Sequence, residues 1–112
     1  PEQRRQRQDL TAMLVLPAEL THVQAQTCLN VLLQAAEAEA APQVLVDASA
    51  LTRFDSSALA VLLECRRECL QDGKGFAVRG LSPRLRELAQ LYGVLALLPD
   101  PAAVESAVLA AA

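Results

Sequence analysis

The fold is decided by residues 44–59, which read VLVDASALTRFDSSAL. The apolar run 44–46 predicts a short buried strand, and a polar turn leads from it into a helix that begins near Ser56. Asp55, Ser56 and Ser57 therefore lie at a helix N-terminus, where unpaired backbone N–H groups and the positive end of the helix dipole gather. Such a position suits a helix cap, a bound anion or a hydroxyl that accepts a phosphate.

Short apolar runs elsewhere predict further strands, so that the predicted set covers residues 12–16, 44–46, 76–78 and 95–98. None of these runs alternates between apolar and polar residues, which indicates that at least one face of the sheet is covered. Residues 1–9 are polar and have no apolar period, which fits a tail or a poorly patterned edge strand.

Helical patterns separate these strands and are predicted for residues 21–41, 56–71, 83–92 and from about 102 onward. In the third of them Ser82 serves as the N-cap and Pro83 opens the helix, while Tyr92 is expected to face inward. The alternation of strand and helix predicts an α/β domain. We expect a small mixed β-sheet of about four to five strands, covered mainly on one face by about four helices.

Length and composition limit the class of protein. The 112 residues suit one compact domain, which we place at 10–112 after the polar segment. A net charge of −3 and only 3% aromatic residues argue against binding to nucleic acid. No apolar run approaches the roughly 20 residues of a membrane span, and no signal sequence opens the chain, so we expect a cytoplasmic protein without direct membrane insertion.

The sequence shows no catalytic or metal-binding motif, because its candidate residues lack the partner residues that such motifs require. His22 has no nucleophile or carboxylate at a recognisable spacing, and Asp47 is best explained as the residue that fixes a turn. Cys65 and Cys69 share a helix face without a second cysteine pair, which predicts buried small side chains in a reducing compartment. The scattered glycines form no phosphate-binding loop. We therefore expect no enzymatic activity, no metal and no cofactor.

Residues 46–59 resemble the signature of STAS domains, the fold of anti-sigma factor antagonists and of domains attached to anion transporters. The shared pattern is a strand, a turn with Asp and Ser, and a helix that starts Asp-Ser/Thr-Ser/Thr-Gly-Leu, with Ala58 here in place of the glycine. The resemblance covers roughly residues 10–100 and implies a STAS-like fold. It also implies a partner-binding surface made of Arg53, Asp55, Ser56, Ser57 and Ala58, with Ser56 as the candidate phosphorylation site.

Two further segments resemble one branch of that family. Residues 17–20 (PAEL), and residues 85–94 followed by Leu98-Pro99, are similar to the STAS subunit of the Mla-type phospholipid-transport ABC complex. This implies an adaptor that binds and regulates the cytoplasmic ATPase, at the inner-membrane face of the transporter complex. The alternative is an anti-sigma factor antagonist whose partners are an anti-sigma factor and a serine kinase. In that case a phosphate on Ser56 adds about two negative charges beside Asp55, which disfavours a docked partner.

Overall fold

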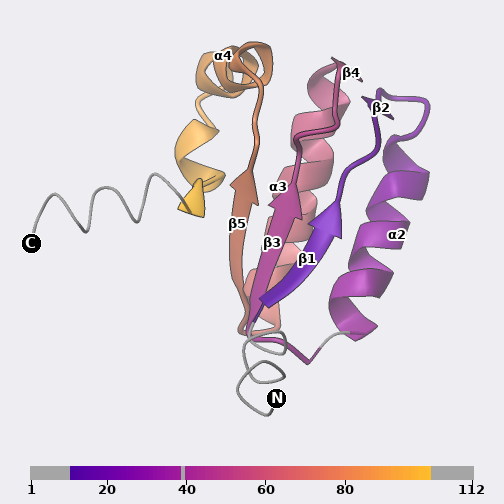
Figure 1. Ribbon diagram of the computed structural model, residues 1–112, viewed down its shortest axis with the longest axis vertical. Coiled ribbons are helices and arrows are strands. Elements are labelled where there is room, and N and C mark those ends of the chain that lie inside the picture. Colours follow the sequence, from indigo (N-terminus) through magenta and orange to yellow (C-terminus); the bar gives the residue numbers. More distant parts are fainter. Residues whose placement is uncertain (1–10, 39, 102–112) are drawn as a thin grey trace, which may run out of the picture.

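The structure is a computed structural model that describes residues 11–38 and 40–101. Within these residues the helices and strands follow in the order β1 (Thr11–Val15), β2 (Glu19–Leu20), α2 (Ala25–Ala38), β3 (Gln43–Asp47), β4 (Arg53–Phe54), α3 (Ser56–Gln71), β5 (Gly75–Arg79), α4 (Pro83–Leu91) and the 3-10 helix η1 (Leu95–Leu97) (Figure 1). The predicted α/β class is confirmed, with three α-helices in the described ranges.

The strands form two separate parallel ladders. The main sheet has the order β1-β3-β5, and its register places Leu14 beside Val46 and Val46 beside Val78. A second ladder joins the two-residue strands β2 and β4. Over residues 11–38 and 40–101 every strand pair is parallel, and the larger sheet has three strands.

The strand predicted at residues 95–98 is a short 3-10 helix instead. The chain turns at Gly93, which has a φ of +72°, and Pro99 follows directly, so the segment has no room to extend along β5. It still contacts the outer edge of the sheet, because the N–H of Val78 donates to the carbonyl of Pro99 at 2.9 Å. Leu98 is buried there and closes that end of the core.

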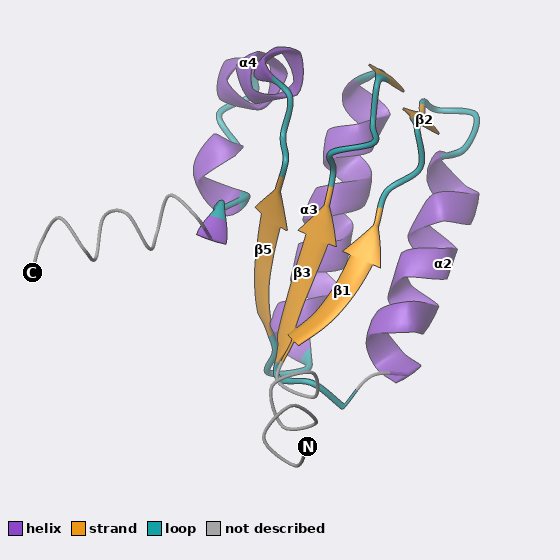
Figure 2. Cartoon of the chain, in the orientation of Figure 1, coloured by secondary structure: helices purple, strands orange, loops and turns teal. Residues whose placement is uncertain are grey.

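Helices α2 and α3 cover one face of the main sheet (Figure 2). The core forms between them from alternate strand residues and from the inner side of α3, which contributes Ala58, Leu59, Val61, Leu62, Cys65 and Cys69. The two cysteines are buried as predicted, and burial is the main reason that the pKa of the Cys65 thiol rises to about 12. The opposite face of the sheet leaves Met13 and Val15 exposed.

The predicted helices agree with the structure best where capping signals were strong. Helix α3 spans the predicted residues, and α4 begins at Pro83 behind the Ser82 cap. Helix α2 begins at Ala25 rather than near Thr21, because the hydroxyl and N–H of Thr21 bond to Gln24 in a preceding turn. Tyr92 is 59% exposed rather than inward-facing. The segment 1–9 and the helix predicted from residue 102 lie outside the described residues.

Candidate functional site

The start of α3 is organised by one carboxylate. Asp55 has an extended backbone and is the N-cap residue, and its Oδ1 accepts a hydrogen bond from the Ser57 N–H at 2.8 Å. Ser56 and Ser57 lie inside the first turn and do not cap it. The Ser56 side chain is exposed, and no hydrogen bond to it is present in the described part of the chain. The hydroxyl of Ser56 is therefore the chemically available group at this helix end.

The second oxygen of Asp55 binds a residue that the sequence patterns did not associate with it. Oδ2 accepts the backbone N–H of His22 at 3.0 Å and lies 3.2 Å from the ring Nδ1. The His22 N–H is the largest cause of a lowered pKa of Asp55, about 2, and the Ser57 N–H contributes further. The carboxylate is therefore ionised and fixed between two segments that lie 33 residues apart in the sequence.

The turn before α3 is held by residues 18–22. The N–H groups of Thr52 and Arg53 both donate to the Ala18 carbonyl, at 2.9 and 3.0 Å, and β2 pairs with β4 beside them. Glu19 lies 4.0 Å from the Arg53 guanidinium, measured from Oε1 to Nε. The sequence patterns do not predict that residues 18–22 hold this turn, because strands of two residues have no periodic signal. The PAEL segment at residues 17–20 nevertheless belongs to the family resemblance.

The structure brings together four of the five predicted partner-binding residues at one surface. The side chain of Arg53 is 78% exposed, Ser56 is exposed, and Asp55 and Ser57 are partly buried. Ala58 is different, because it is 0% exposed and belongs to the core under α3. Its side chain does not reach the surface, and its small size serves the packing of the first turn rather than contact with a partner.

Asp47 has the structural role that the sequence predicts. Its Oδ1 accepts both the N–H and the hydroxyl of Ser49, at 2.9 and 2.5 Å, and Arg79 donates to Oδ2 at 3.1 Å. The Ser49 hydroxyl is the largest cause of its lowered pKa, about 2. Its two oxygens bind the turn after β3 and Arg79 of β5, so Asp47 stabilises the fold and is no part of the surface around Ser56.

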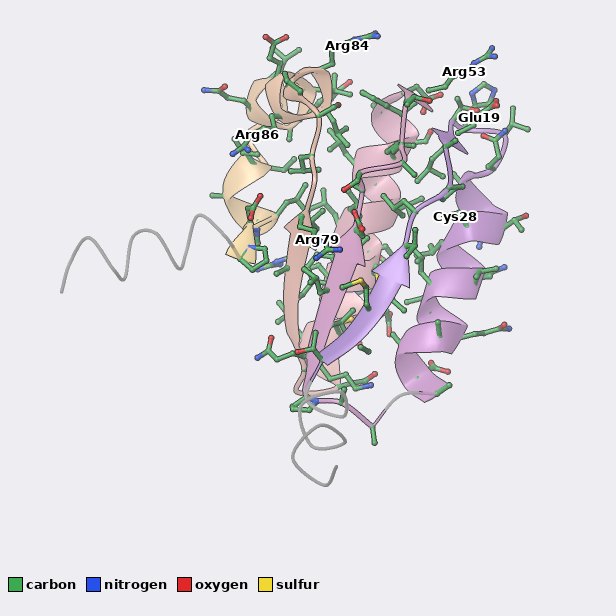
Figure 3. The ribbon with its side chains drawn as sticks, in the orientation of Figure 1. Glu19, Cys28, Arg53, Arg79, Arg84 and Arg86 are labelled. Atoms are coloured by element: carbon green, nitrogen blue, oxygen red, sulfur yellow. The ribbon has the colours of Figure 1, made fainter. Side chains whose placement is uncertain are left out.

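A shallow apolar groove lies beside Ser56. It encloses about 280 Å³ between α3 and the chain after α4 and is lined by Ser56, Leu59, Ala60, Leu63, Tyr92 and Val94. Two cationic side chains project at the same end of the molecule, Arg53 from β4 and Arg84 from the first turn of α4 (Figure 3). The Arg84 guanidinium lies over the Phe54 ring, 5.9 Å from its centroid.

A larger groove lies elsewhere, between β1 and α2, and encloses about 600 Å³. Val15, Val23 and Val31 give it an apolar lining, and Cys28 lies in it with a pKa that burial raises. Residues 11–38 and 40–101 hold no group of three His, Cys, Asp or Glu side chains placed to bind a metal ion. No helix within those ranges is long and apolar enough to cross a bilayer.

Comparisons with known proteins agree with this architecture. A family model described as "Mlab, STAS domain" matches residues 4–99. Among solved structures, an anti-sigma-factor antagonist (STAS) domain protein from Planctomyces limnophilus is 25% identical, with a TM-score of 0.68 and 79% of each chain covered. None of the curated proteins searched matches the chain.

Two more distant structures share the fold alone. The anti-sigma factor antagonist SpoIIAA in its unphosphorylated form is 22% identical, with a TM-score of 0.66, over 80% of this chain and 78% of that one. A sulfate transporter family protein from Wolinella succinogenes is 18% identical, with a TM-score of 0.64, over 79% and 70%. Because the family model covers most of the sequence and the same fold is found in these structures, the chain belongs to the STAS domain family.

Proposed function

We propose that this STAS domain is a non-enzymatic adaptor that binds and regulates the cytoplasmic ATPase of an Mla-type phospholipid-transport ABC transporter. The observation that carries the proposal is the match of residues 4–99 to the family model described by the name Mlab. The similarity of residues 17–20 and 85–94 to Mla-type subunits supports it. In this proposal the domain reaches the inner-membrane face through the transporter complex and not by insertion of its own.

The docking surface consists of Arg53, Asp55, Ser56 and Ser57 together with the exposed side of α3. Two features support it as a binding surface: the Ser56 hydroxyl is exposed, and the turn that carries it is held from residues 18–22 by several hydrogen bonds. A preorganised surface loses little conformational entropy when a partner binds. A domain that binds one conformation of the ATPase better than another shifts the ATPase population toward that conformation.

The direct test is co-purification of the ATPase subunit with Ser56→Glu. A carboxylate at this exposed position leaves the Asp55 cap in place but adds charge and bulk at the centre of the surface, so the recovered ATPase is expected to fall to a small fraction of the wild-type yield. Gln34→Glu, which adds the same charge at an exposed position of α2, is the control and is expected to bind normally. Wild-type recovery with Ser56→Glu would show that the surface is wrongly placed.

Asp55→Lys is a second variant, and its effect on binding must be separated from its effect on folding. It reverses a charge at the surface, but it also removes the acceptor of the Ser57 and His22 N–H groups. Loss of binding by this variant therefore counts only if circular dichroism and the urea midpoint show a folded domain. Ser56→Ala, which removes a hydroxyl without hydrogen bonds in the described structure, is expected to keep the fold, so a fall in ATPase recovery reports the contact of this hydroxyl with the partner.

The second candidate function is an anti-sigma factor antagonist regulated by phosphorylation of Ser56. It is favoured by the exposed hydroxyl at the first position of α3 and by the likeness of the fold to SpoIIAA, whose structure is known in unphosphorylated and phosphorylated forms. Affinity purification from the native cell separates the two candidates. ABC ATPase and permease chains support the adaptor, whereas a serine kinase that adds one phosphate to the wild type and none to Ser56→Ala supports the antagonist.

A further inference from the structure

We infer that the docking surface recognises an acidic segment of the ATPase, one that inserts an apolar side chain into the groove between α3 and the chain after α4 and places a carboxylate near Arg53 and Arg84. This inference rests on the proposed function and adds the chemistry of the partner to it. It combines two independent features of the same end of the molecule, an apolar groove and a pair of exposed cations.

The groove has the size and lining of a site for one side chain. Its volume of about 280 Å³ exceeds that of a single large apolar side chain, and four of its six lining residues are Leu59, Ala60, Leu63 and Val94. Leu59 forms the buried floor, and Ala60 is exposed and leaves the entrance open. Tyr92 closes one side and is 59% exposed. Burial of an apolar partner residue here removes apolar surface of both chains from water.

The end of α4 carries a second exposed apolar side chain. Leu91, which precedes Tyr92, is 81% exposed. Aromatic residues at the edge of a pocket are typical anchors of protein interfaces, because they offer much contact area at a small entropic cost. The Ser56 hydroxyl also lines the groove, so a partner seated in it contacts the residue whose substitution tests the proposed function.

The charge around the groove favours an acidic partner over a basic one. Arg84 is exposed, and its contact is the Phe54 ring rather than a carboxylate in the described ranges. Arg53 is 78% exposed, and Glu19 lies at 4.0 Å from it, beyond hydrogen-bonding distance. Asp55 directs both oxygens to N–H groups of its own chain. Glu19 lies near Arg53 and Asp55 remains ionised, so the cation without a carboxylate partner in the described ranges is Arg84, and a partner carboxylate is attracted to its guanidinium.

The test measures the affinity of the purified ATPase subunit for four variants of the full chain. Arg84→Glu is expected to weaken binding about tenfold or more at low salt, and less at high salt because screening reduces the charge effect. Its control is Arg86→Glu, which makes the same change on α4 at a side chain that projects elsewhere (Figure 3). Ala60→Arg is expected to block the groove and weaken binding to a similar extent. Its control is Gln34→Arg, which adds the same side chain at an exposed position of α2 that does not line this groove.

A photo-crosslinking residue at position 92 supplies a readout that does not depend on affinity. The ATPase peptide that it captures is expected to carry an apolar residue with Asp or Glu within a few positions. A captured peptide that is basic, or equal binding by the wild type, Arg84→Glu and Ala60→Arg, overturns the inference while the adaptor function stands. Failure of the wild-type chain to bind the ATPase at all instead removes the proposed function.

Discussion

Asp55 shows how one side chain acquires two structural tasks. One oxygen caps α3 through the Ser57 N–H, and the other binds the backbone N–H of His22. The first bond is local and follows from the Asp-Ser-Ser order. The second depends on a segment 33 residues away and fixes the position of the turn relative to the start of α2. The exposed Ser56 hydroxyl is thereby held on a rigid support.

Gly80 has a positive φ and also lies close to Ser49, so both its backbone conformation and its surroundings disfavour a side chain. Its φ is +74°, and an added Cβ would meet the Ser49 hydroxyl and lie 3.0 Å from the Ser49 nitrogen. Gly73 has the same φ but nothing within 4 Å of such a Cβ, so it is a matched control. Gly73→Ala is expected to lower the free energy of unfolding by about 1–2 kcal/mol through φ alone.

Gly80→Ala is expected to lower the free energy of unfolding by clearly more than Gly73→Ala, because the Ser49 backbone must also move. Urea denaturation of the two variants measures the difference. Because Ser49→Ala also removes the hydrogen bond to Asp47, the comparison is made in that background, where Gly80→Ala is expected to cost less than it does in the wild type. An equal fall in the free energy of unfolding for the two glycine variants would show that the contact with Ser49 does not affect stability.

Helix α3 is the element on which the fold and the candidate site both depend. Its inner side is almost continuously buried from Ala58 to Leu62, while Ser56 and Ala60 on the same turns remain exposed. Its N-terminus carries the proposed docking surface, and its inner side packs under the sheet. The helix therefore connects the surface around Ser56 directly to the hydrophobic core, which limits how far that surface can move.

Leu62→Ala tests the role of α3 in the core. Leu62 is 0% exposed, so removal of its side chain leaves a cavity, and the free energy of unfolding is expected to fall by about 2–5 kcal/mol. Leu91→Ala makes the same chemical change at a side chain that is 81% exposed and is expected to change the free energy of unfolding by less than about 0.5 kcal/mol. Similar urea midpoints for the two variants would contradict this description of the core.

At the scale of the whole molecule, the carboxylates of Asp47 and Asp55 hold separate segments together, and they make the stability of the fold depend on pH. Asp47 links the turn after β3 to Arg79 of β5, and Asp55 links α3 to the start of α2. Both have a pKa of about 2 in the folded state, below the value of about 3.9 for an unperturbed Asp. Because the folded state binds protons less readily than the unfolded chain, stability is lost as the pH falls.

The urea midpoint is therefore expected to stay constant above about pH 5 and to fall steadily between about pH 4 and pH 2. The double variant Asp47→Asn, Asp55→Asn is expected to start from a lower midpoint at neutral pH and to lose less of it on acidification. Midpoints measured by circular dichroism at several pH values give this comparison. An acid profile of the double variant that parallels the wild type would assign the acid sensitivity to other carboxylates.

Much of the fold follows from local patterns, and the errors have physical causes. Helices α3 and α4 match their predicted positions because Asp55, Ser82 and Pro83 mark their starts. Strands β2 and β4 were missed because each has two residues and their pairing joins distant segments. The apolar run 95–98 satisfies the criteria of a strand, but Gly93 and Pro99 at its two ends confine it to a short 3-10 helix.

The sequence by itself determined the alternation of strands and helices, the buried side of α3 and the placement of Asp55 and Ser56 at a helix start, because these depend on periodicity and capping within a few residues. Only the tertiary structure decided that Ala58 lies under the surface and that His22 binds Asp55. It also decided that Arg53 and Arg84 project at the same end of the molecule. These relations join segments far apart in the chain, and packing of the sheet, α3 and α4 is what brings them together.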